Sequence, residues 1–449
     1  METALIILAA GQGTRMNSDM PKVLHRIAGA PLLVHAMISG RALEPARTVI
    51  VTGHGAEAVR KATLAEDETA EVVVQEEQKG TGHAVAQALP ALGGFQGKAV
   101  VLFGDTPFIR PETLQALVGH SADVVVLGFH AADPGRYGRL ITEGETLSRI
   151  VEYKDATPEE RRVTLCNSGV IACDAGLLAE LVGSLTNDNA AGEYYLTDLV
   201  AAARRQGLTA AVVICPEAET LGVNTRADLA AAEAAFQARA RAEALANGVT
   251  LTAPQTVFFA YDTVIGRDAI IAPHVIFGPG VTVESGAVIE AFCHLTGCHV
   301  SRGATVGPFA RLRPGAELAE DVHVGNFVEV KNAILDEGVK VGHLTYIGDA
   351  HVGEHTNIGA GTVTCNYDGA MKHRTTIGKR VFIGSDTMLV APVTVGDDAM
   401  TASGSVITEN VPDAALALGR ARQVNKPGLA VRLMEKLRAT KASRTKGDV

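Results

Sequence analysis

The chain carries a glycine-rich segment with two cations near its N-terminus, at residues 8–16 (LAAGQGTRM), followed by Pro21-Lys22. Closely spaced glycines after an apolar run let the main chain approach a phosphate, because its N–H groups can then point at the anion. A dinucleotide-binding fingerprint needs a third glycine where this chain has Met16, and the Gly-Lys-Ser/Thr of a Walker A loop is missing. The segment therefore predicts a phosphate site of a third kind, in which Arg15 and Lys22 neutralise charge.

Two further side chains have types and positions suited to catalysis. Asp105 follows the apolar run at 98–103, and a carboxylate at the end of a buried strand can hold a hard cation. His343 is one of eight histidines in the second half, each with an imidazole that can accept a proton near neutral pH, and residue type alone does not distinguish it from structural or solvated ones. The first residue indicates phosphoryl chemistry and the second is of a type that can transfer a proton.

Composition limits the classes of protein and of partner. The length of 449 residues predicts two or three domains, and the formal net charge of -10 argues against nucleic-acid binding, which needs a basic face. The six cysteines form no CxxC pair, which favours reduced thiols and a cytoplasmic protein. The apolar run at 4–10 lacks a basic flank and is too short to span a bilayer, so we expect a buried strand and no membrane partner.

The first half has the pattern of an α/β fold. Short runs rich in Val and Ile alternate with amphipathic stretches such as PLLVHAMISGRAL and TLQALVGH. The apolar runs are ALIILAA, TVIVTG, EVVVQ, KAVVLFGD, DVVVLGF and TAAVVIC. Apolar strands separated by helices predict a mainly parallel, doubly wound, Rossmann-like sheet. Such sheets bind ligands at the carboxyl ends of their strands, where residues 8–16 and Asp105 both lie.

The second half has a different periodicity. Residues 228–247 are rich in Ala and contain no Gly or Pro, so they predict one long helix that joins the halves. Beyond Gly248 an apolar residue recurs at every sixth position with one slip, which predicts a left-handed parallel β-helix of hexapeptide repeats. These positions are Ile265, Ile271, Phe277, Val283, Ile289, Leu295, Val300, Val306, Leu312, Leu318, Val324, Val330, Ile377, Ile383, Leu389 and Val395.

The two patterns predict four parts of the chain. They are a nucleotide-binding domain at 1–225, a linker helix at 226–248, a β-helix at 249–423 and a basic tail at 424–449. Residues 362–376 interrupt the hexapeptide repeat, and a loop inserted into a solenoid usually carries function or an interface. The scattered cations of the tail favour a mobile solubilising end, partly helical, over a binding arm.

The order of the motifs resembles one enzyme family over nearly the whole chain. The motifs are LAAGQGTRM with the following PK, GTGHA at 80–84, GPFARLRPG, HVGNFVEVK, GHLTYIGDA, NIGAGTVTCNYDG and GSDTMLVAPV. The chain is similar to the bacterial bifunctional N-acetylglucosamine-1-phosphate uridyltransferase/glucosamine-1-phosphate acetyltransferase family. The resemblance implies acetylation of glucosamine-1-phosphate by acetyl-CoA. Uridylyl transfer from UTP with Mg²⁺ would then give UDP-N-acetylglucosamine and pyrophosphate, in a homotrimer.

The resemblance also implies the residues of the uridyltransferase site, with Arg15 and Lys22 as catalytic cations. Asp105 and Asn224 would coordinate Mg²⁺, although Asn224 taken alone is better interpreted as a turn-forming residue. Three residues would read uracil, namely Gln75, Gly80 and Thr81, and three would hold the acetamido sugar, namely Gly138, Glu152 and Asn167. The remaining nucleotide contacts would be Leu8, Ala9, Ala10, Gly11 and Gly13.

In the acetyltransferase half the resemblance makes His343 the general base. The sugar phosphate would bind Arg313, Lys331, Tyr346 and Asn357, with Lys372 as a further contact. Acetyl-CoA would bind Ala360, Asn366, Tyr367, Ser385, Ser403 and Arg420. Family members often carry Tyr at Phe103 and Ala at Ser403, so one nucleotide contact and one CoA contact are open to change here. Glu329 is either an assistant to His343 or a solvated carboxylate.

Other interpretations stay open on the residues alone. The first half could be a different sugar-1-phosphate nucleotidyltransferase, with a β-helix that only drives oligomerisation. The β-helix could be a scaffold without chemistry, which the NYDG loop and His343 oppose. A metal-bearing β-helix hydratase with His351 and His355 as ligands is a further alternative, but their spacing suits a helix better than a solenoid.

Overall fold

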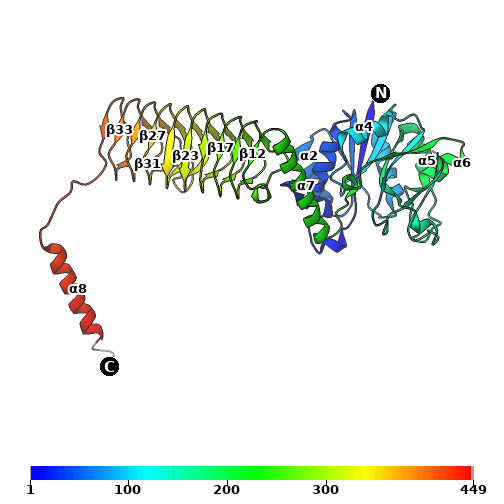
Figure 1. Cartoon of the computed structure of the whole chain (residues 1–449), viewed down its shortest axis with the longest axis horizontal. Helices are drawn as coiled ribbons and strands as arrows, with labels where there is room; N and C mark the ends of the chain where they lie inside the picture. The colour runs from blue at the N-terminus through cyan, green and yellow to red at the C-terminus, as the bar shows by residue number, and fades with distance from the viewer. Residues whose placement is uncertain (1, 145, 446–449) are drawn as a thin grey trace. The chain divides into compact units, whose positions relative to one another are not determined.

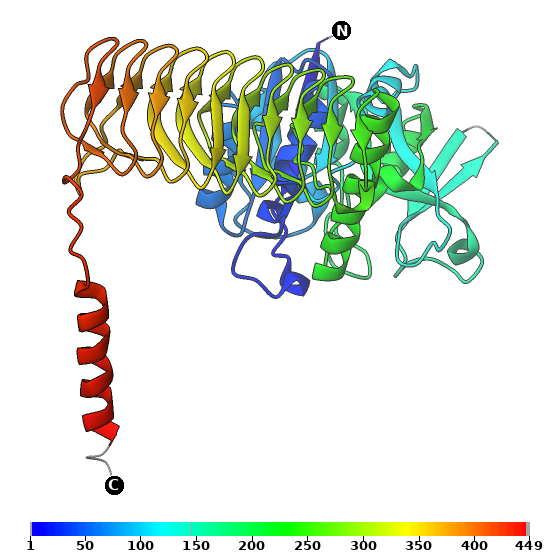
Figure 2. The same cartoon turned by 60° about the vertical axis from the view of Figure 1, so that its left-hand side comes forward.

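The computed structural model describes residues 2–144 and 146–445 (Figures 1 and 2). The chain divides into two compact units. The first comprises Met1–Asn247, Ala253–Val264 and Ile276–Val281, and the second comprises Gly248–Thr252, Ile265–Val275 and Thr282–Val449. Within the described ranges, every helix is too short or too polar to cross a bilayer.

The first unit is built on a sheet whose strands follow the order β11-β7-β10-β6-β1-β4-β5. All neighbours in this order are parallel except β10, which is antiparallel to both β6 and β7. The predicted doubly wound α/β fold is thereby confirmed. The strands are β1 (Thr3–Ala9), β4 (Arg47–Thr52), β5 (Glu71–Val74), β6 (Lys98–Phe103), β7 (Val124–His130), β10 (Leu165–Asp174) and β11 (Ala210–Ile214).

The predictions did not include β10 or the hairpin of β8 (Arg139–Glu143) and β9 (Thr146–Val151) that pairs with it. The register between β10 and β7 shifts between Asn167 and Ile171. The polar and flexible residues at this irregularity break the continuous apolar run by which the other strands were identified.

The alternation of β1 explains why helices cover both faces of this sheet. Ile6 packs into the core on one face and Ile7 into the core on the other, because successive strand residues point to opposite sides. The helices that contribute to the Ile6 core are α3 (Thr81–Ala88), α5 (Ala175–Gly183) and α6 (Asp198–Arg205). Those that contribute to the Ile7 core are α1 (Leu32–Arg41), α2 (Ala56–Glu66) and α4 (Pro111–Gly119).

The predicted Ala-rich helix is confirmed as α7 (Arg226–Ala246). It begins with a capping box, in which Thr225 Oγ1 accepts from the Asp228 N–H at 3.1 Å and the Asp228 carboxylate accepts from the Thr225 N–H at 2.8 Å. The same carboxylate accepts from the Asn224 N–H at 3.0 Å. The cap therefore holds the backbone of Asn224 in place beside the helix start.

The second unit is a stack of short parallel strands in three columns, which Figure 2 shows coil by coil. The hexapeptide positions predicted from the sequence are all buried except Ile265, which is half-buried. The first column consists of β12 (Thr250–Leu251), β14 (Ile270–Ile271), β17 (Val288–Ile289), β20 (Thr305–Val306), β23 (His323–Asn326), β25 (Lys340–His343), β27 (Asn357–Ile358), β30 (Phe382–Ile383), β33 (Met400–Thr401) and β35 (Leu416–Ala417).

The other two columns share the long strands β24 (Glu329–Leu335) and β26 (Tyr346–Val352). One of them contains β16 (Thr282–Val283), β19 (Cys298–Val300), β22 (Ala316–Leu318), β29 (Thr375–Ile377) and β32 (Val393–Val395). The other contains β18 (His294–Leu295), β21 (Arg311–Leu312), β28 (Val363–Cys365), β31 (Met388–Val390) and β34 (Val406–Ile407).

The interruption of the repeat is a loop between β28 and β29, which an antiparallel bridge between Tyr367 and Lys372 closes. The insertion expected from the broken periodicity is thus confirmed. The predicted basic tail contains α8 (Leu429–Thr445).

Candidate active sites

A cavity of about 300 Å³ opens where β1, β5 and β6 end in the first unit. The main chain of the glycine-rich segment lines it, together with side chains from neighbouring segments. It contains many of the residues predicted for the nucleotide, namely Leu8, Ala9, Ala10, Gly11, Lys22, Gln75, Gly80, Thr81 and Asp105. The carboxyl ends of parallel strands are the place where α/β sheets bind ligands.

Gly13 shows why the segment needs its second glycine. Its φ of 64° lies in the left-handed region, and a Cβ at this position would lie 2.5 Å from the Cβ of Lys22. The short helices η1 (Thr14–Met16) and η2 (Lys22–Leu24) can therefore pack closely. This packing places Lys22 in the wall of the cavity.

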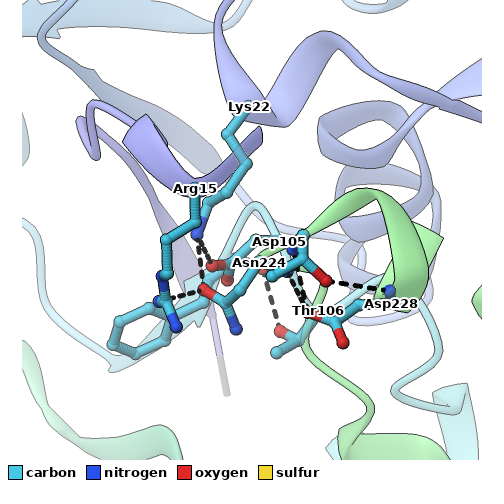
Figure 3. Close-up of polar contacts among 8 residues, drawn as sticks. Arg15, Lys22, Asp105, Thr106, Asn224 and Asp228 are labelled. Carbon is cyan, nitrogen blue, oxygen red and sulfur yellow. Dashed lines mark hydrogen bonds and ion pairs between the residues drawn. The ribbon is translucent and has the colours of Figure 1, made fainter. Parts of the chain in front are cut away.

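The predicted cations and metal ligands form one polar cluster, shown in Figure 3. Lys22 Nζ donates to Asp105 Oδ2 and, at 3.2 Å, to Asn224 Oδ1. Arg15 donates to the same Asn224 oxygen at 2.9 Å. The Val223 N–H donates to the carbonyl oxygen of Asp105 at 3.0 Å, which ties the two metal-ligand segments together. The structure thus brings together four residues from three segments that lie far apart in the sequence.

This cluster passes a simple test for a divalent cation. The Lys22 ammonium contacts one oxygen of Asp105 and one of Asn224, so both oxygens converge on a single cationic position. Carboxylate and amide oxygens are ligands that Mg²⁺ accepts, and Mg²⁺ commonly takes only one or two carboxylates from the protein and the rest from phosphate and water. The donor set therefore fits a magnesium ion shared with a nucleotide.

The residues predicted for the acetamido sugar also lie together. A Cβ added to Gly138 would lie 3.5 Å from Glu152 Oε1 and 3.6 Å from the Asn167 Cβ. Thr197 Oγ1 donates to Glu152 Oε1 at 3.1 Å. Burial raises the pKa of Glu152, while the Thr197 hydrogen bond lowers it and the nearby Asp155 and Asp198 raise it further.

In the second unit, one corner of the coils brings together His343 and most residues predicted for acetyl-CoA. The Gly361 N–H donates to Leu344 O at 3.2 Å, the Asp386 N–H to Ala360 O at 2.7 Å, and the Gly404 N–H to Ser385 O at 2.8 Å. The corner therefore carries, in successive coils, His343, Ala360, Ser385 and Ser403, with Arg420 near Gly404. Asn326 Oδ1 lies 3.3 Å from His343 Nδ1.

A second corner of the same coils carries the cations. Lys331 lies against Lys372, whose ammonium is the largest cause that lowers the pKa of Lys331, and Arg313 acts in the same direction. Asp349 is 8% exposed and accepts from Asn332 Nδ2 at 2.5 Å and from Asn366 Nδ2. Burial opposes ionisation of Asp349, but these bonds and the two lysines hold its pKa below the ordinary value.

Some predicted contacts are not assembled within one chain. Asn357 lies on β27, in the column of His343, whereas Lys331 and Tyr346 lie on β24 and β26 in other columns. Glu329, for which assistance to His343 and a solvated carboxylate were both open, lies in an ion pair with arginines. Its carboxylate accepts from Arg313 at 2.8 Å and from Arg311 at 3.4 Å.

Several residues that contact predicted site residues were not themselves predicted, and Asp349 and His83 are among them. Asp349 lies within the motif GHLTYIGDA and His83 within GTGHA, so both stood inside segments already selected. Sequence alone did not show that the Asp349 carboxylate is buried against two asparagines or that His83 contacts Gln75. Those contacts depend on strand register and on how α3 follows β5.

Two family models match the chain. Residues 5–163 match the MobA-like NTP transferase domain, and residues 262–297 and 374–409 match the bacterial transferase hexapeptide (six repeats). Together with the two site regions, these matches define a class, which is a nucleotidyltransferase joined to a hexapeptide-repeat acyltransferase.

Curated relatives match over nearly the full length. The chain is 74% identical to a protein of Cereibacter sphaeroides, over 99% of this chain and 98% of the relative. It is 69% identical to a protein of Paracoccus denitrificans, over 98% and 99%, and 68% identical to one of Ruegeria sp., over 100% of each. All three are named "Bifunctional protein GlmU". The chain belongs to the GlmU family and is a bifunctional transferase.

We expect the raised pKa of Glu152 to appear in the pH dependence of nucleotidyl transfer. An ionised carboxylate accepts a hydrogen bond from a sugar hydroxyl, and protonation removes one acceptor. Because the pKa of Glu152 is raised, its carboxylate is protonated at a higher pH than that of an ordinary glutamate. As the solution is acidified, the KM for the sugar phosphate should therefore begin to rise at a correspondingly higher pH. Glu152→Gln should raise this KM roughly tenfold at neutral pH and flatten the profile. An unchanged KM and profile in the variant would contradict this.

We expect Asp349→Asn to lower acetyl transfer by roughly tenfold and to leave nucleotidyl transfer unchanged. A carboxylate only accepts, so it forces Asn366 to turn its NH₂ group inward, whereas an amide at position 349 can also donate and allows Asn366 to rotate. Both activities are measured on the same preparation, and thermal unfolding checks the β-helix. Wild-type acetyl transfer in the folded variant would contradict the assignment.

Proposed function

We propose that the second unit transfers the acetyl group of acetyl-CoA to the amine of glucosamine-1-phosphate. The first unit then transfers uridylyl from UTP to the resulting N-acetylglucosamine-1-phosphate, giving UDP-N-acetylglucosamine and pyrophosphate. One observation carries the proposal, which is that two separate cation clusters, Arg15 with Lys22 and Lys331 with Lys372, lie in different units. Each cluster has its own set of neighbouring oxygen and amide groups, so each can hold a phosphate for a different reaction.

In uridylyl transfer the phosphate oxygen of the sugar attacks the α-phosphorus of UTP, and pyrophosphate leaves. The main chain of the glycine-rich segment can direct N–H groups at the triphosphate, and Arg15 and Lys22 neutralise the charge that builds up on it. Asp105 and Asn224 would hold Mg²⁺, which supplies further neutralisation of phosphate charge when bound. Gly138, Glu152 and Asn167 would orient the sugar.

In acetyl transfer the amine nitrogen attacks the thioester carbonyl carbon, and the bond from that carbon to the CoA sulfur breaks. His343 takes the amine proton and returns it to the departing thiolate. Asn326 can orient the imidazole through Nδ1. The corner that carries Ala360, Ser385 and Ser403 would hold CoA along the stack, with its thioester toward His343. The Lys331 and Lys372 ammonium groups would bind the sugar phosphate.

We further propose a homotrimer whose acetyl sites combine residues of neighbouring chains. His343 and Asn366 lie at different corners of the same coils of one chain. A site that contains both residues would therefore form where the His343 corner of one chain meets the Asn366 corner of a neighbouring chain. The corner of His343 also carries a stack of exposed rings, with centroids 4.9, 4.8 and 5.3 Å apart, from His274 through Phe292 and Phe309 to Phe327. Exposed apolar rows of this kind mark interfaces.

Two further expectations remain proposals. All six cysteines are free, which supports a reducing, cytoplasmic location. The second is the division of the chain by function. It comprises a uridyltransferase domain at 1–225, a linker helix at 226–248, an acetyltransferase β-helix at 249–423 and a tail at 424–449. Limited proteolysis with an assay of both activities tests it.

Paired substitutions test the assignment of the two activities. Asp105→Ala should lower uridylyl transfer by about a hundredfold or more and leave acetyl transfer intact, because the lost oxygen ligand serves only the phosphoryl step. His343→Ala should do the reverse, by about a hundredfold or more. Product analysis with glucosamine-1-phosphate, acetyl-CoA, UTP and Mg²⁺ measures both. Parallel loss of both activities in either folded variant would contradict the assignment.

Mixing tests the shared acetyl site. A His343→Ala chain and an Asn366→Ala chain, each inactive alone, should regain part of the acetyl activity after co-refolding, because some mixed trimers contain one intact site. Uridylyl transfer should be present in each chain before mixing, since its predicted residues all lie in the first unit. A monomer by light scattering with full acetyl transfer would overturn the shared site.

A further inference from the structure

The amide of Gln75 has only one orientation that satisfies its surroundings. Gln75 follows β5, is 4% exposed and lines the nucleotide cavity. Its side-chain nitrogen lies 3.1 Å from the carbonyl oxygen of Gly80 and 3.0 Å from His83 Nδ1. Because a main-chain carbonyl oxygen can only accept, the end of the amide that faces Gly80 must be the NH₂ group.

His83 takes the second hydrogen of this NH₂ group. One hydrogen is donated to Gly80 O, so the other is donated to His83 Nδ1, which must carry the lone pair while Nε2 carries the proton. Both hydrogens of Gln75 are then used. Its remaining polar atom is Oε1, for which the described part of the chain provides no hydrogen-bond donor. The cavity therefore receives an acceptor and not a donor from Gln75.

The position of His83 is itself fixed. It lies in the first turn of α3, and its ring lies 6.4 Å from the ring of Tyr194. The Gly82 N–H donates to Tyr194 O at 2.8 Å, and a Cβ on Gly80 would lie 2.7 Å from the same oxygen. On the other side of the ring, the side-chain nitrogen of Gln87 is placed 3.3 Å from His83 Nε2; because Nε2 carries the proton, the Gln87 amide must be turned so that its oxygen faces the ring and accepts. These contacts hold the imidazole against Gln75.

We propose that His83 is a positioning residue that sets the pyrimidine specificity of nucleotidyl transfer by fixing Gln75 with Oε1 toward the base. The proposal rests on the proposed function, in which Gln75 contacts uracil. Uracil presents an N–H donor at N3, whereas cytosine presents a lone pair there and an amino group at the neighbouring carbon. A fixed acceptor binds the first edge and repels the second, and a mobile amide could turn to suit either.

Two variants at one position separate orientation from folding. His83→Leu removes the acceptor, so Gln75 keeps only its bond to Gly80 O. His83→Asn keeps an acceptor oxygen close to the position of Nδ1. His130→Leu changes an exposed histidine at the end of β7 and serves as a matched control. For each full-length chain, kcat/KM is measured with UTP and with CTP, and acetyl transfer is measured on the same sample.

We expect His83→Leu to lower the UTP to CTP ratio of kcat/KM by about tenfold, because the orientation with Oε1 toward the base then keeps only one of its two supporting hydrogen bonds and its preference over the turned amide is weakened. His83→Asn and His130→Leu should keep the wild-type ratio to within about threefold. An unchanged ratio in His83→Leu with normal acetyl transfer would overturn the inference, as would equal loss of the ratio in His83→Asn. If the wild-type chain itself does not prefer UTP, the proposed function fails instead, so the two failures are distinguishable.

Discussion

Each site holds two cations close together before any phosphate is bound to neutralise their charges. Like charges at short range repel, so each cluster needs oxygen atoms whose positions the fold fixes. In the first unit Asp105 and Asn224 take this part for Lys22 and Arg15. In the second unit the buried Asp349 carboxylate lies beside Lys331 and Lys372. The arrangement is costly without a ligand and is stabilised by an anion, which suits a binding site.

The two folds supply this rigidity in different ways. In the first unit, helices bury both faces of the sheet, so the strand ends that carry Asp105 and the glycine-rich segment are anchored by apolar packing. In the second unit every coil rests on its neighbours through main-chain hydrogen bonds, and side chains at the same corner repeat along the stack. Side chains from several coils can therefore line one continuous strip of surface.

Groups that only accept hydrogen bonds impose an orientation on the amides beside them. A carboxylate or a carbonyl oxygen accepts only, and each such group determines which end of a neighbouring amide it receives. Asp349 orients Asn332 and Asn366 in this way, and Gly80 O with His83 orients Gln75. The pKa of Glu152 is raised by burial, which opposes its ionisation, and is lowered by the hydrogen bond from the Thr197 hydroxyl.

The sequence by itself determined most of the elements and most of the residues that the structure gathers at the two candidate sites. The continuous apolar runs such as that of β1, the Ala-rich run of α7 and the six-residue period are local properties, so the doubly wound sheet, the long helix and the β-helix could be predicted. The strand β10 could not, because its irregularity at Asn167 breaks the local pattern. Only the tertiary structure decided that Glu329 pairs with Arg313, that Asn357 lies in another column from Lys331, and that Asp349 and His83 orient amides. These are contacts between distant segments, and strand register and packing, which no local pattern encodes, determine them.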